Sequence, residues 1–315
     1  MNGTKIGVSI SATGASESVA KIQRIDEMGI HAAWLTSGGG AGDSMAVLAA
    51  AAASTDAILL GTSIVQTWSR HPVSLVQQAQ VIADLAPGRF RLGVGPSHRT
   101  PMERMFGADF RAPLGHLREY LQIVKPLIQS GSVEFEGRWY SAAATLPGPL
   151  DVPVMGSALM PGAFELCGAE ADGAISWVCP HFYLRDTAMG ALRRGARSAG
   201  KPTPPMIVHA PISVTDDINA ARNGVRERLG YFPSTPFYAR MFAESGFIGT
   251  PVSGWTDEML DSVLISGDED AVAEQIQGIF DWGASEVLLS VVSGSDDAAG
   301  SEDRTLSLLS KLSTS

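Results

Sequence analysis

The sequence predicts a (β/α)₈ barrel, a ring of eight parallel strands with helices outside, and three observations support this fold class. Short apolar or β-branched runs alternate with longer amphipathic runs along the 315 residues. Eight such strand–helix units can be placed, which favours a closed ring over a doubly wound open sheet. The 34 glycines and 18 prolines are spread along the chain, as expected for many turns rather than disorder. We therefore expect residues 1–315 to form one barrel domain.

Eight segments have the length and composition of buried strands. Turn-forming or charged residues flank most of them, which is how short parallel strands are usually delimited. They are Lys5–Ile10, Ala32–Thr36, Ala57–Val65, Phe90–Gly95, Val154–Ser157, Gly173–Trp177, Met206–Val214 and Glu286–Val292.

The helices between them are predicted from amphipathic spacing and from their stop signals. Ser16–Met28 ends at Gly29, Val73–Leu85 ends before a Pro-Gly pair, and Leu114–Gln129 ends before Gly131. The alanine-rich run from Met45 to Ser54 is expected to be a buried helix. The remaining predicted helices are Gly162–Cys167, Tyr183–Ser198, Asp216–Leu229 and Asp268–Trp282.

Two connections are too long for a plain helical crossover. They follow the fourth and seventh strands, at 96–153 and 215–285, where insertions would build the mouth of the barrel. The second contains the aromatic and proline-rich run 231–238. That run suits an ordered lid, an oligomer contact or a packed surface loop, and the sequence does not choose among them.

Charge and cysteine content exclude several classes of protein. The net charge of −10 argues against binding to nucleic acid or to an anionic membrane. The N-terminal residues lack a signal-type apolar stretch, and no run reaches transmembrane length, so we expect a cytoplasmic protein. Cys167 and Cys179 are twelve residues apart without a CxxC pair, which argues against a disulfide framework or structural zinc.

Chemistry in a barrel of this kind takes place at the carboxyl ends of the strands. The five lysines lie elsewhere, which disfavours a Schiff base. His71, His98 and His181 follow strands three, four and six and could together suggest zinc. No strand end offers an Asp or Glu to complete such a site, so we predict no metal.

Glycines cluster at or after the ends of three of the strands. Residues 37–42 resemble a phosphate loop, but no Gly-Lys-Ser/Thr ends them, so a flexible loop is the better interpretation. Gly93 and Gly95 would let a planar ligand approach the backbone. The turn 156–162 offers Ser157 and free N–H groups, which could hold a phosphate or could form a simple tight turn.

Several segments in fixed order resemble the luciferase-like monooxygenase superfamily, and more closely its actinobacterial branch of oxidoreductases that use coenzyme F-420, an 8-hydroxy-5-deazaflavin. Each segment alone is a weak signal, and the set covers nearly the whole chain. The segments are Leu60-Gly61-Thr62-Ser63, Arg70-His71-Pro72, Gly88 through His98, His116-Leu117-Arg118-Glu119-Tyr120-Leu121, and Val152-Pro153-Val154-Met155 through Ala171-Asp172-Gly173.

The resemblance implies where the cofactor binds. Family members carry a non-prolyl cis peptide after strand three, whose counterpart is Ser63-Ile64. His98 occupies a position that is commonly Glu, whereas the end of strand two lacks the family's Asp or His. Met160 replaces a glycine of the family's cofactor loop. The residues expected to contact the cofactor are Ser37, Ser63, Ile64, Gln66, Gly95, His98, Ser157, Ala158, Leu159, Met160 and Trp177.

The resemblance also implies the reaction. A hydride would pass between C5 of the deazaflavin and an activated C=C, C=N or C=O carbon of a small molecule, with His98 handling a proton and His71 as the second candidate. Family sugar-phosphate dehydrogenases carry basic residues after strand six, where this chain has Trp177-Val178-Cys179-Pro180, so an apolar or aromatic substrate is expected. The alternatives are an FMN-dependent monooxygenase and a non-catalytic cofactor-binding protein. Relatives often form homodimers, and the sequence leaves this open.

The anionic tail of the cofactor would need a local cationic patch on a protein of net charge −10. Arg99, Arg104 and Arg111 lie close together after strand four. We expect them to contact this tail, or else to pair with Glu103 and Asp109 at the surface.

Overall fold

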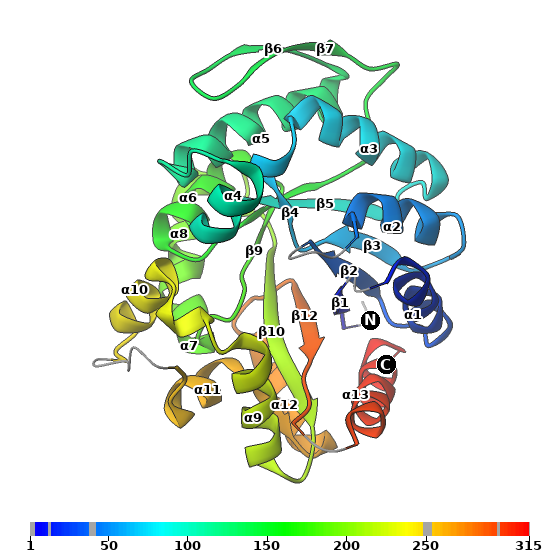
Figure 1. The fold of residues 1–315 in the computed structure, drawn as a ribbon, viewed down its shortest axis with the longest axis vertical. Coiled ribbons are helices and arrows are strands. Elements are labelled where there is room, and N and C mark those ends of the chain that lie inside the picture. Colours follow the sequence, from blue (N-terminus) through cyan, green and yellow to red (C-terminus); the bar gives the residue numbers. More distant parts are fainter. Residues whose placement is uncertain (1–3, 12–13, 38–41, 248–253, 295–296, 315) are drawn as a thin grey trace.

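Eight parallel strands close into a ring in the computed structural model, which describes residues 4–11, 14–37, 42–247, 254–294 and 297–314 (Figure 1). The last strand of the ring pairs with the first, as Ile6 lies opposite Val287. The predicted fold class is therefore confirmed. In ring order the strands are β1 (Ile6–Ser11), β2 (Ala32–Thr36), β3 (Leu59–Thr62), β5 (Phe90–Gly95), β8 (Val154–Ser157), β9 (Gly173–Ile175), β10 (Met206–Val214) and β12 (Glu286–Val291).

Helices surround the ring because the outward-facing residues of the strands are apolar and need cover. Several helices begin at an acidic side chain that caps them: Asp43 accepts from the N–H of Ala46, and Asp268 from that of Ala271. The helices of the outer layer are α1 (Ala15–Glu27), α2 (Ser44–Ala52), α3 (Pro72–Leu85), α5 (Pro113–Ser130), α6 (Pro161–Glu170), α7 (His181–Tyr183), η2 (Leu184–Ala188), α8 (Met189–Ser198), α12 (Glu269–Asp281) and α13 (Ala298–Thr314).

The third predicted strand, Ala57–Val65, is wrong as one continuous element. It divides into β3 and the short β4 (Val65–Gln66), both of which pair with β5. The Ser63–Ile64 peptide between them is cis, as the resemblance implied. The sixth predicted strand also ends earlier than expected, at Ile175 rather than Trp177. Both differences lie at the carboxyl ends of strands, where the chain turns to form the mouth.

The described residues of both long connections contain further helices and strands. The first, after β5, contains α4 (Arg99–Phe106) and, beyond α5, a hairpin of β6 (Ser132–Glu136) and β7 (Ser141–Thr145) at the top of Figure 1. The second, after β10, contains α9 (Ile218–Leu229), η3 (Phe232–Ser234), α10 (Pro236–Glu244), α11 (Asp257–Val263) and β11 (Ile265–Gly267). β11 pairs with the last three residues of β10 and so extends the sheet beyond the ring.

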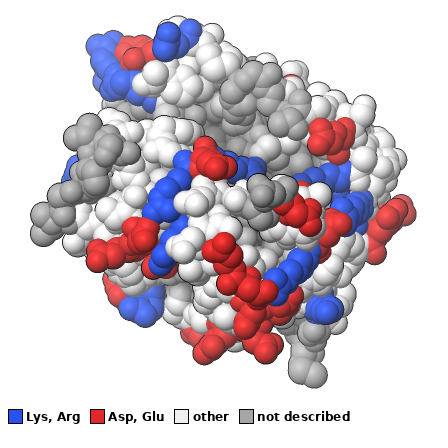
Figure 2. All heavy atoms as spheres, turned by 60° about the horizontal axis from the view of Figure 1, so that its bottom comes forward, with Lys and Arg blue, Asp and Glu red and all other residues white. Residues whose placement is uncertain are grey.

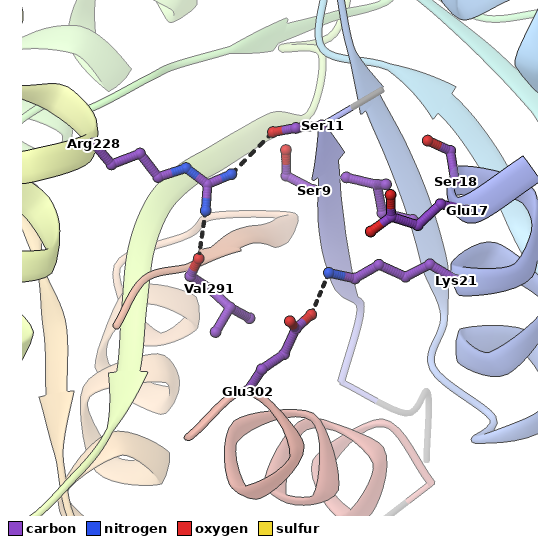
Figure 3. Close-up of a pocket in the computed structure, with 9 residues that line it drawn as sticks. Ser9, Ser11, Glu17, Ser18, Lys21, Arg228, Val291 and Glu302 are labelled. Carbon is purple, nitrogen blue, oxygen red and sulfur yellow. Dashed lines mark hydrogen bonds and ion pairs between the residues drawn. The ribbon is translucent and has the colours of Figure 1, made fainter. Parts of the chain in front are cut away.

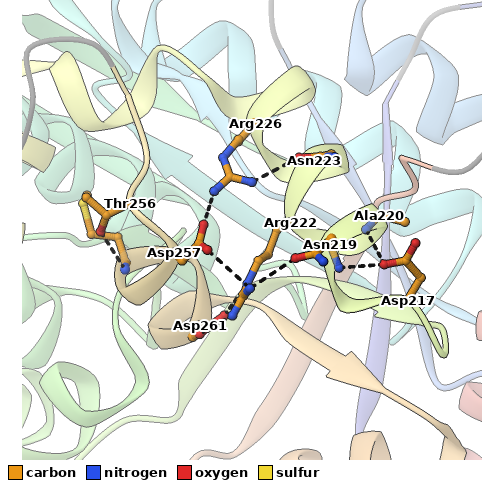
Figure 4. Close-up of polar contacts among 10 residues, drawn as sticks. Asp217, Asn219, Ala220, Arg222, Asn223, Arg226, Thr256, Asp257 and Asp261 are labelled. Atoms are coloured by element: carbon orange, nitrogen blue, oxygen red, sulfur yellow. Dashed lines mark hydrogen bonds and ion pairs between the residues drawn. The ribbon is translucent and has the colours of Figure 1, made fainter.

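Ion pairs connect two helices of the second insertion (Figure 4). Arg222 of α9 bonds to Asp261 at 2.7 Å and reaches Asp257 of α11 at 3.4 Å. Arg226, one turn further along α9, also pairs with Asp257. These contacts hold α9 and α11 together at the surface.

The amino-terminal end of the barrel interior contains a buried charge cluster. Glu286 of β12 accepts a hydrogen bond from the indole N–H of Trp34 at 2.8 Å and pairs with Arg91 of β5. The guanidinium of Arg91 also lies over the Trp34 ring, 4.4 Å from its centroid. The indole fits because Gly61 faces it: a Cβ there would lie 2.3 Å from the Trp34 ring. Packing around Trp34 closes this end of the barrel.

The surface is predominantly acidic, in line with the net charge. In Figure 2, acidic side chains gather over the lower part of the face shown, with basic side chains among them. None of the helices in the described ranges is long and apolar enough to cross a membrane.

Candidate active site

The carboxyl end of the barrel interior is lined by hydroxyl groups. The Oγ of Ser9 on β1 lies 3.1 Å from Oγ1 of Thr36 on β2, which lies 3.4 Å from Oγ of Ser63 after β3. Because alternate residues of a strand face the same side, these hydroxyls lie above the apolar and charged layers of the barrel. They form a neutral, hydrogen-bonding floor at the mouth.

β5 brings its backbone into this floor through two glycines. A Cβ on Gly93 would lie 2.0 Å from the carbonyl oxygen of Thr62, and one on Gly95 would lie 2.1 Å from Oγ of Ser157. Both distances are too short for any side chain, so these positions accept only glycine without rearrangement. The result is a flat stretch of backbone beside the cis peptide.

The loop after β2 is tied to the bulge after β3. The side-chain amide of Gln66 donates to the carbonyl oxygen of Ser37 at 3.2 Å, and the Ser37 hydroxyl bonds to that of Ser44 at the start of α2. Residues 38–41 of the predicted glycine loop lie outside the described residues. Ser37 and Gln66, both predicted as cofactor contacts, therefore adjoin each other.

An aromatic and imidazole pair lies on the opposite side of the mouth. The rings of Trp177, just after β9, and His209, on β10, have centroids 3.9 Å apart. Nε2 of His209 lies 2.8 Å from Oγ of Ser290 on β12. Burial, and to a smaller extent the charge of Arg228, lowers the pKa of His209 to about 3, so this ring is neutral at physiological pH.

His98 lies among aromatic rings of the second insertion. Its ring centroid is 5.6 Å from that of Phe232, 5.8 Å from Tyr238 and 6.4 Å from Tyr231. Burial lowers its pKa below the ordinary 6.5. No described residue forms a hydrogen bond with this imidazole, so both ring nitrogens are available to a ligand.

Two backbone positions at the mouth have an unusual conformation. Ser97, directly before His98, has a φ of 58°, and Val178, directly after Trp177, has a φ of 51°. A left-handed conformation of a residue other than glycine costs roughly 1 kcal/mol or more and is often found at functional sites. The cost is highest for Val178, whose side chain is β-branched. The surrounding packing thus constrains the turns that present His98 and Trp177.

The aromatic run of the second insertion packs onto the site. Tyr231, Phe232 and Tyr238 form what we call the aromatic cover. The hydroxyl of Tyr238 donates to the carbonyl oxygen of Trp177 at 3.0 Å, and the Phe232 and Trp177 rings have centroids 6.1 Å apart. Among the three interpretations of this run, the contacts favour an ordered lid. Tyr231 and Phe237 remain exposed on its outer side.

His71, His116 and His181 have surroundings different from those of His98. The exposed His71 is the N-cap of α3, and its Nδ1 accepts from the N–H of Val73 at 3.3 Å. His116 is buried against Trp68 and hydrogen-bonded by Tyr140, and burial lowers its pKa to about 4. His181 begins α7, and Nε2 of its ring is buried without a hydrogen-bond partner in the part of the chain that the structure describes.

The turn after β8 offers few donors for a phosphate. Its helix α6 begins at Pro161, which has no N–H, and the N–H of Ala163 already bonds to the carbonyl oxygen of Met160 at 2.9 Å. The carbonyl oxygen of Leu159 accepts the hydroxyl of Tyr183 at 2.9 Å. Ala158, Leu159 and Met160 therefore form a packed turn. Ser157, at the end of β8, lies beside Gly95 of β5.

The arginines after β5 are largely paired at the surface. Arg99 bonds to Glu103 at 2.8 Å, and Arg111 pairs with Asp109. Arg104 makes no ion pair with a described residue. Of the two expectations for these arginines, pairing with Glu103 and Asp109 holds for Arg99 and Arg111. Arg104 is the most available of the three for an anionic ligand.

A small cavity of about 150 Å³ adjoins the mouth between β1, α1 and α13 (Figure 3). Ser9 and Ser11 line one side, and Lys21 pairs with Glu302 across it.

Within the described ranges, no group of three or more His, Cys, Asp and Glu side chains could hold a metal ion. Burial raises the pKa of the Cys179 thiol to about 12, so it is not an activated nucleophile.

His209 and Ser290 were not among the predicted site residues. His209 lies inside the predicted strand Met206–Val214, and nothing in its local sequence marks it as a site residue. Ile207 faces the barrel interior, and residues two apart on a strand face the same side. This alternation could have placed His209 in the mouth. No local pattern connects it to Ser290, which is 81 residues away.

These groups fit a flat, uncharged heteroaromatic ring. The floor offers hydroxyl donors and acceptors, β5 offers backbone without side chains, and Trp177 and His98 offer aromatic surfaces. The described side chains of this floor and cover include no carboxylate. A nicotinamide-sized or flavin-sized ring could therefore be held by stacking and neutral hydrogen bonds.

Comparison with known proteins agrees with this geometry. A family model described as luciferase-like monooxygenase matches residues 3–286. An F-420-dependent glucose-6-phosphate dehydrogenase of Nakamurella multipartita is 33% identical over 53% of this chain and 52% of its own length. A 5,10-methylenetetrahydromethanopterin reductase of Archaeoglobus fulgidus is 24% identical over 87% of this chain and 89% of its own.

Solved structures with the same fold cover nearly the whole chain. An F-420-dependent secondary alcohol dehydrogenase, in complex with an F-420–acetone adduct, superposes with a TM-score of 0.82 at 18% identity, over 99% of this chain and 98% of its own. A type II Baeyer–Villiger monooxygenase component of Pseudomonas putida, in complex with FMN, superposes with a TM-score of 0.75 at 18% identity, over 98% and 97% of the two chains. At these identities the likeness concerns the fold.

Proposed function

The chain belongs to the luciferase-like monooxygenase family, and from this premise we propose that it is an F-420-dependent oxidoreductase acting on an uncharged apolar or aromatic substrate. The observation that carries the proposal is the neutral mouth, where β5 glycines, hydroxyls and aromatic rings converge. The F-420-dependent names among its relatives support the choice of cofactor.

The residues that would hold the deazaflavin ring are those around the flat backbone of β5. Gln66 pairs with Gly95 next to the cis peptide Ser63–Ile64, and in this proposal Trp177 and His98 would complete the ring pocket. When bound, the deazaflavin would supply a carbon that carries the hydride. The protein contributes orientation, exclusion of water and hydrogen bonds.

The more polar part of the cofactor would extend toward Ser37 and Ser157. Ser37 is positioned by Gln66, and Ser157 lies beside Gly95. Because α6 offers few free N–H groups, we assign Ala158, Leu159 and Met160 a packing role against the cofactor. Arg104 is the candidate for the anionic tail.

His98 is the candidate for proton handling. Its imidazole has no hydrogen-bond partner among the described residues and is partly buried, so a hydrogen bond to a ligand would meet little competition from water. A neutral imidazole can donate to a developing negative charge through one nitrogen and accept through the other. His71 is less suited, since its Nδ1 caps α3.

The substrate class follows from the surroundings of His98. A charged substrate held beside Phe232, Tyr238 and Trp177 would lose its hydration without gaining a counter-charge. An apolar or aromatic molecule would instead bury surface against these rings. A phosphorylated sugar, as in the glucose-6-phosphate dehydrogenase relative, does not suit this lining.

A binding titration tests the proposal. Purified protein is mixed separately with F-420 and with FMN, and the absorbance and fluorescence of each cofactor are followed. We expect the protein to shift the spectrum of F-420 at a lower cofactor concentration than that of FMN. Addition of a neutral substrate should then reduce or oxidise the bound F-420. Preferential binding of FMN with oxygen consumption would instead support a flavin monooxygenase. Binding without turnover on any neutral carbonyl, imine or alkene would contradict an oxidoreductase role.

A further inference from the structure

Arg228 connects the second insertion to the rim of the barrel (Figure 3). From α9, its Nη1 donates to the carbonyl oxygen of Val291 at 2.8 Å, and its Nη2 donates to Oγ of Ser11 at 2.9 Å. Ser11 and Val291 are the last residues of β1 and β12, which pair with each other where the ring closes. One side chain thus joins the insertion to two strand ends.

This arginine differs from the others on its helix. Arg222 and Arg226 pair with the carboxylates of α11 at the surface (Figure 4). Arg228 has no carboxylate partner within ion-pair distance among the described residues, and its hydrogen bonds to Val291 and Ser11 go to neutral oxygens. Such bonds depend on the forked geometry of the guanidinium more than on its charge.

The aromatic cover begins three residues after Arg228. α9 ends at Leu229, whose carbonyl oxygen accepts the indole N–H of Trp255 at 2.9 Å. Tyr231 and Phe232 follow and lie against His98. Tyr238 fastens the far end of the cover to Trp177. The cover is therefore held at one end by Tyr238 and at the other by the end of α9.

We propose that Arg228 is a positioning residue that fixes the aromatic cover over His98 by fastening α9 to the ends of β1 and β12. The placement of the cover stands on these contacts alone, and only its consequence for turnover rests on the proposed function. When the fastening is lost, Tyr231 and Phe232 are free to move away from His98. Water then reaches the imidazole.

The pKa of His98 reports this change. Burial is the cause of its lowered pKa, and Tyr231 and Tyr238, the titratable groups that face it, have raised pKa values and stay neutral. Loosening the cover should therefore raise the pKa of His98 toward 6.5. His209 is unsuitable as a reporter, because the charge of Arg228 itself contributes to its lowered pKa.

The test is an NMR titration of the His98 ring in Arg228→Met, with His98→Gln used to assign the signal. We expect the pKa of His98 to rise in Arg228→Met. We expect a rise also in Arg228→Lys, which keeps the charge but loses the fork. Arg240→Met is the matched control, because Arg240 lies in the same insertion and forms an exposed pair with Glu244. It should leave the pKa of His98 where it is in the parent protein.

Ser11→Ala keeps the proposal falsifiable if Arg228→Met does not fold. It removes one of the two acceptors and should raise the pKa of His98 by a smaller amount. An unchanged pKa in the folded Arg228 variants, or an equal rise in Arg240→Met, would overturn the proposal. A rise in pKa in a protein that fails to bind F-420 would uphold the positioning role and contradict only the proposed function.

Discussion

Trp177 and His209 lie against each other inside the mouth of the barrel, with ring centroids 3.9 Å apart and an angle of 39° between the ring planes. Trp177 also touches the aromatic cover through Phe232, and His209 contacts Ser290 on β12. The pair therefore connects the interior of the barrel to the insertion above it. A ligand in the mouth would meet a surface built from β9, β10 and β12 together.

Gly95→Ala should weaken cofactor binding. The added Cβ would lie 2.1 Å from Oγ of Ser157, so Ser157 or the β5 backbone must move within the proposed ring pocket. We expect the dissociation constant for F-420, measured by titration of its absorbance, to rise about tenfold or more, which corresponds to about 1.4 kcal/mol.

Gly278→Ala is the control for this substitution. Gly278 lies in α12, and apart from its own helix backbone no described atom lies within 4 Å of an added Cβ. It should leave cofactor affinity unchanged and raise helix stability by up to about 1 kcal/mol. Equal cofactor affinity of the Gly95→Ala and Gly278→Ala proteins would place the ring away from β5.

Glu286→Gln should destabilise the barrel. The change removes the charge that faces Arg91 at the closed end, where the side chains of Arg91 and Glu286 are 14% and 3% exposed. Breaking a buried ion pair by removing one partner leaves the other charge uncompensated and costs about 3–5 kcal/mol. Urea unfolding should show this loss in the free energy of unfolding.

Glu103→Gln provides the comparison for Glu286→Gln. It breaks an exposed pair with Arg99 and should cost less than about 1 kcal/mol. Similar losses in the two variants would mean that the cluster around Trp34 is hydrated rather than buried.

The sequence was sufficient for the ring of strands and for the position of both insertions, because strand and helix periodicity are local. The cis peptide at Ser63–Ile64 was predicted only through the family resemblance. The break between β3 and β4 was missed, since the apolar composition of Ala57–Val65 continues across it.

The contacts that build the site depend on ring closure, which local patterns do not encode. Arg91 and Glu286 are 195 residues apart, and Arg228 and Ser11 are 217 residues apart. Composition allowed the run 231–238 to be a lid, an oligomer contact or a surface loop. Only the fold brings Phe232 against His98.

The stability of the protein should fall as the pH falls below 6.5. Burial lowers the pKa of His116 to about 4 and that of His209 to about 3, whereas both have ordinary values in the unfolded chain. Between pH 6.5 and the lowered pKa of each ring, the unfolded chain binds more protons than the folded protein does. Acid therefore favours unfolding in this range. Each of these histidines contributes up to about 1.4 kcal/mol per pH unit in this window.

Two variants isolate the contribution of His209. In His209→Phe the slope of the unfolding free energy against pH should be smaller between about pH 6 and pH 5. Ser290→Ala removes the hydrogen bond at 2.8 Å but keeps the titrating ring, and should retain the slope. A slope that is the same in the parent and in His209→Phe would mean that His209 is protonated in the folded protein.

His98→Ala should reduce turnover more than cofactor affinity. The ring has no described protein partner and lies beside the aromatic cover, so its nitrogens can serve the ligand. A positioned proton donor or acceptor contributes roughly 100-fold or more to a rate, which sets the expected loss of kcat. Because burial lowers its pKa, the limb of the parent's pH profile that depends on His98 should lie below pH 6.5 and disappear in the variant.

His71→Ala, which removes the cap of α3, should cost about 1 kcal/mol of stability and leave that limb in place. Loss of affinity alone in His98→Ala would reduce His98 to a binding residue, and loss of the limb in His71→Ala would transfer the proton-handling role to His71.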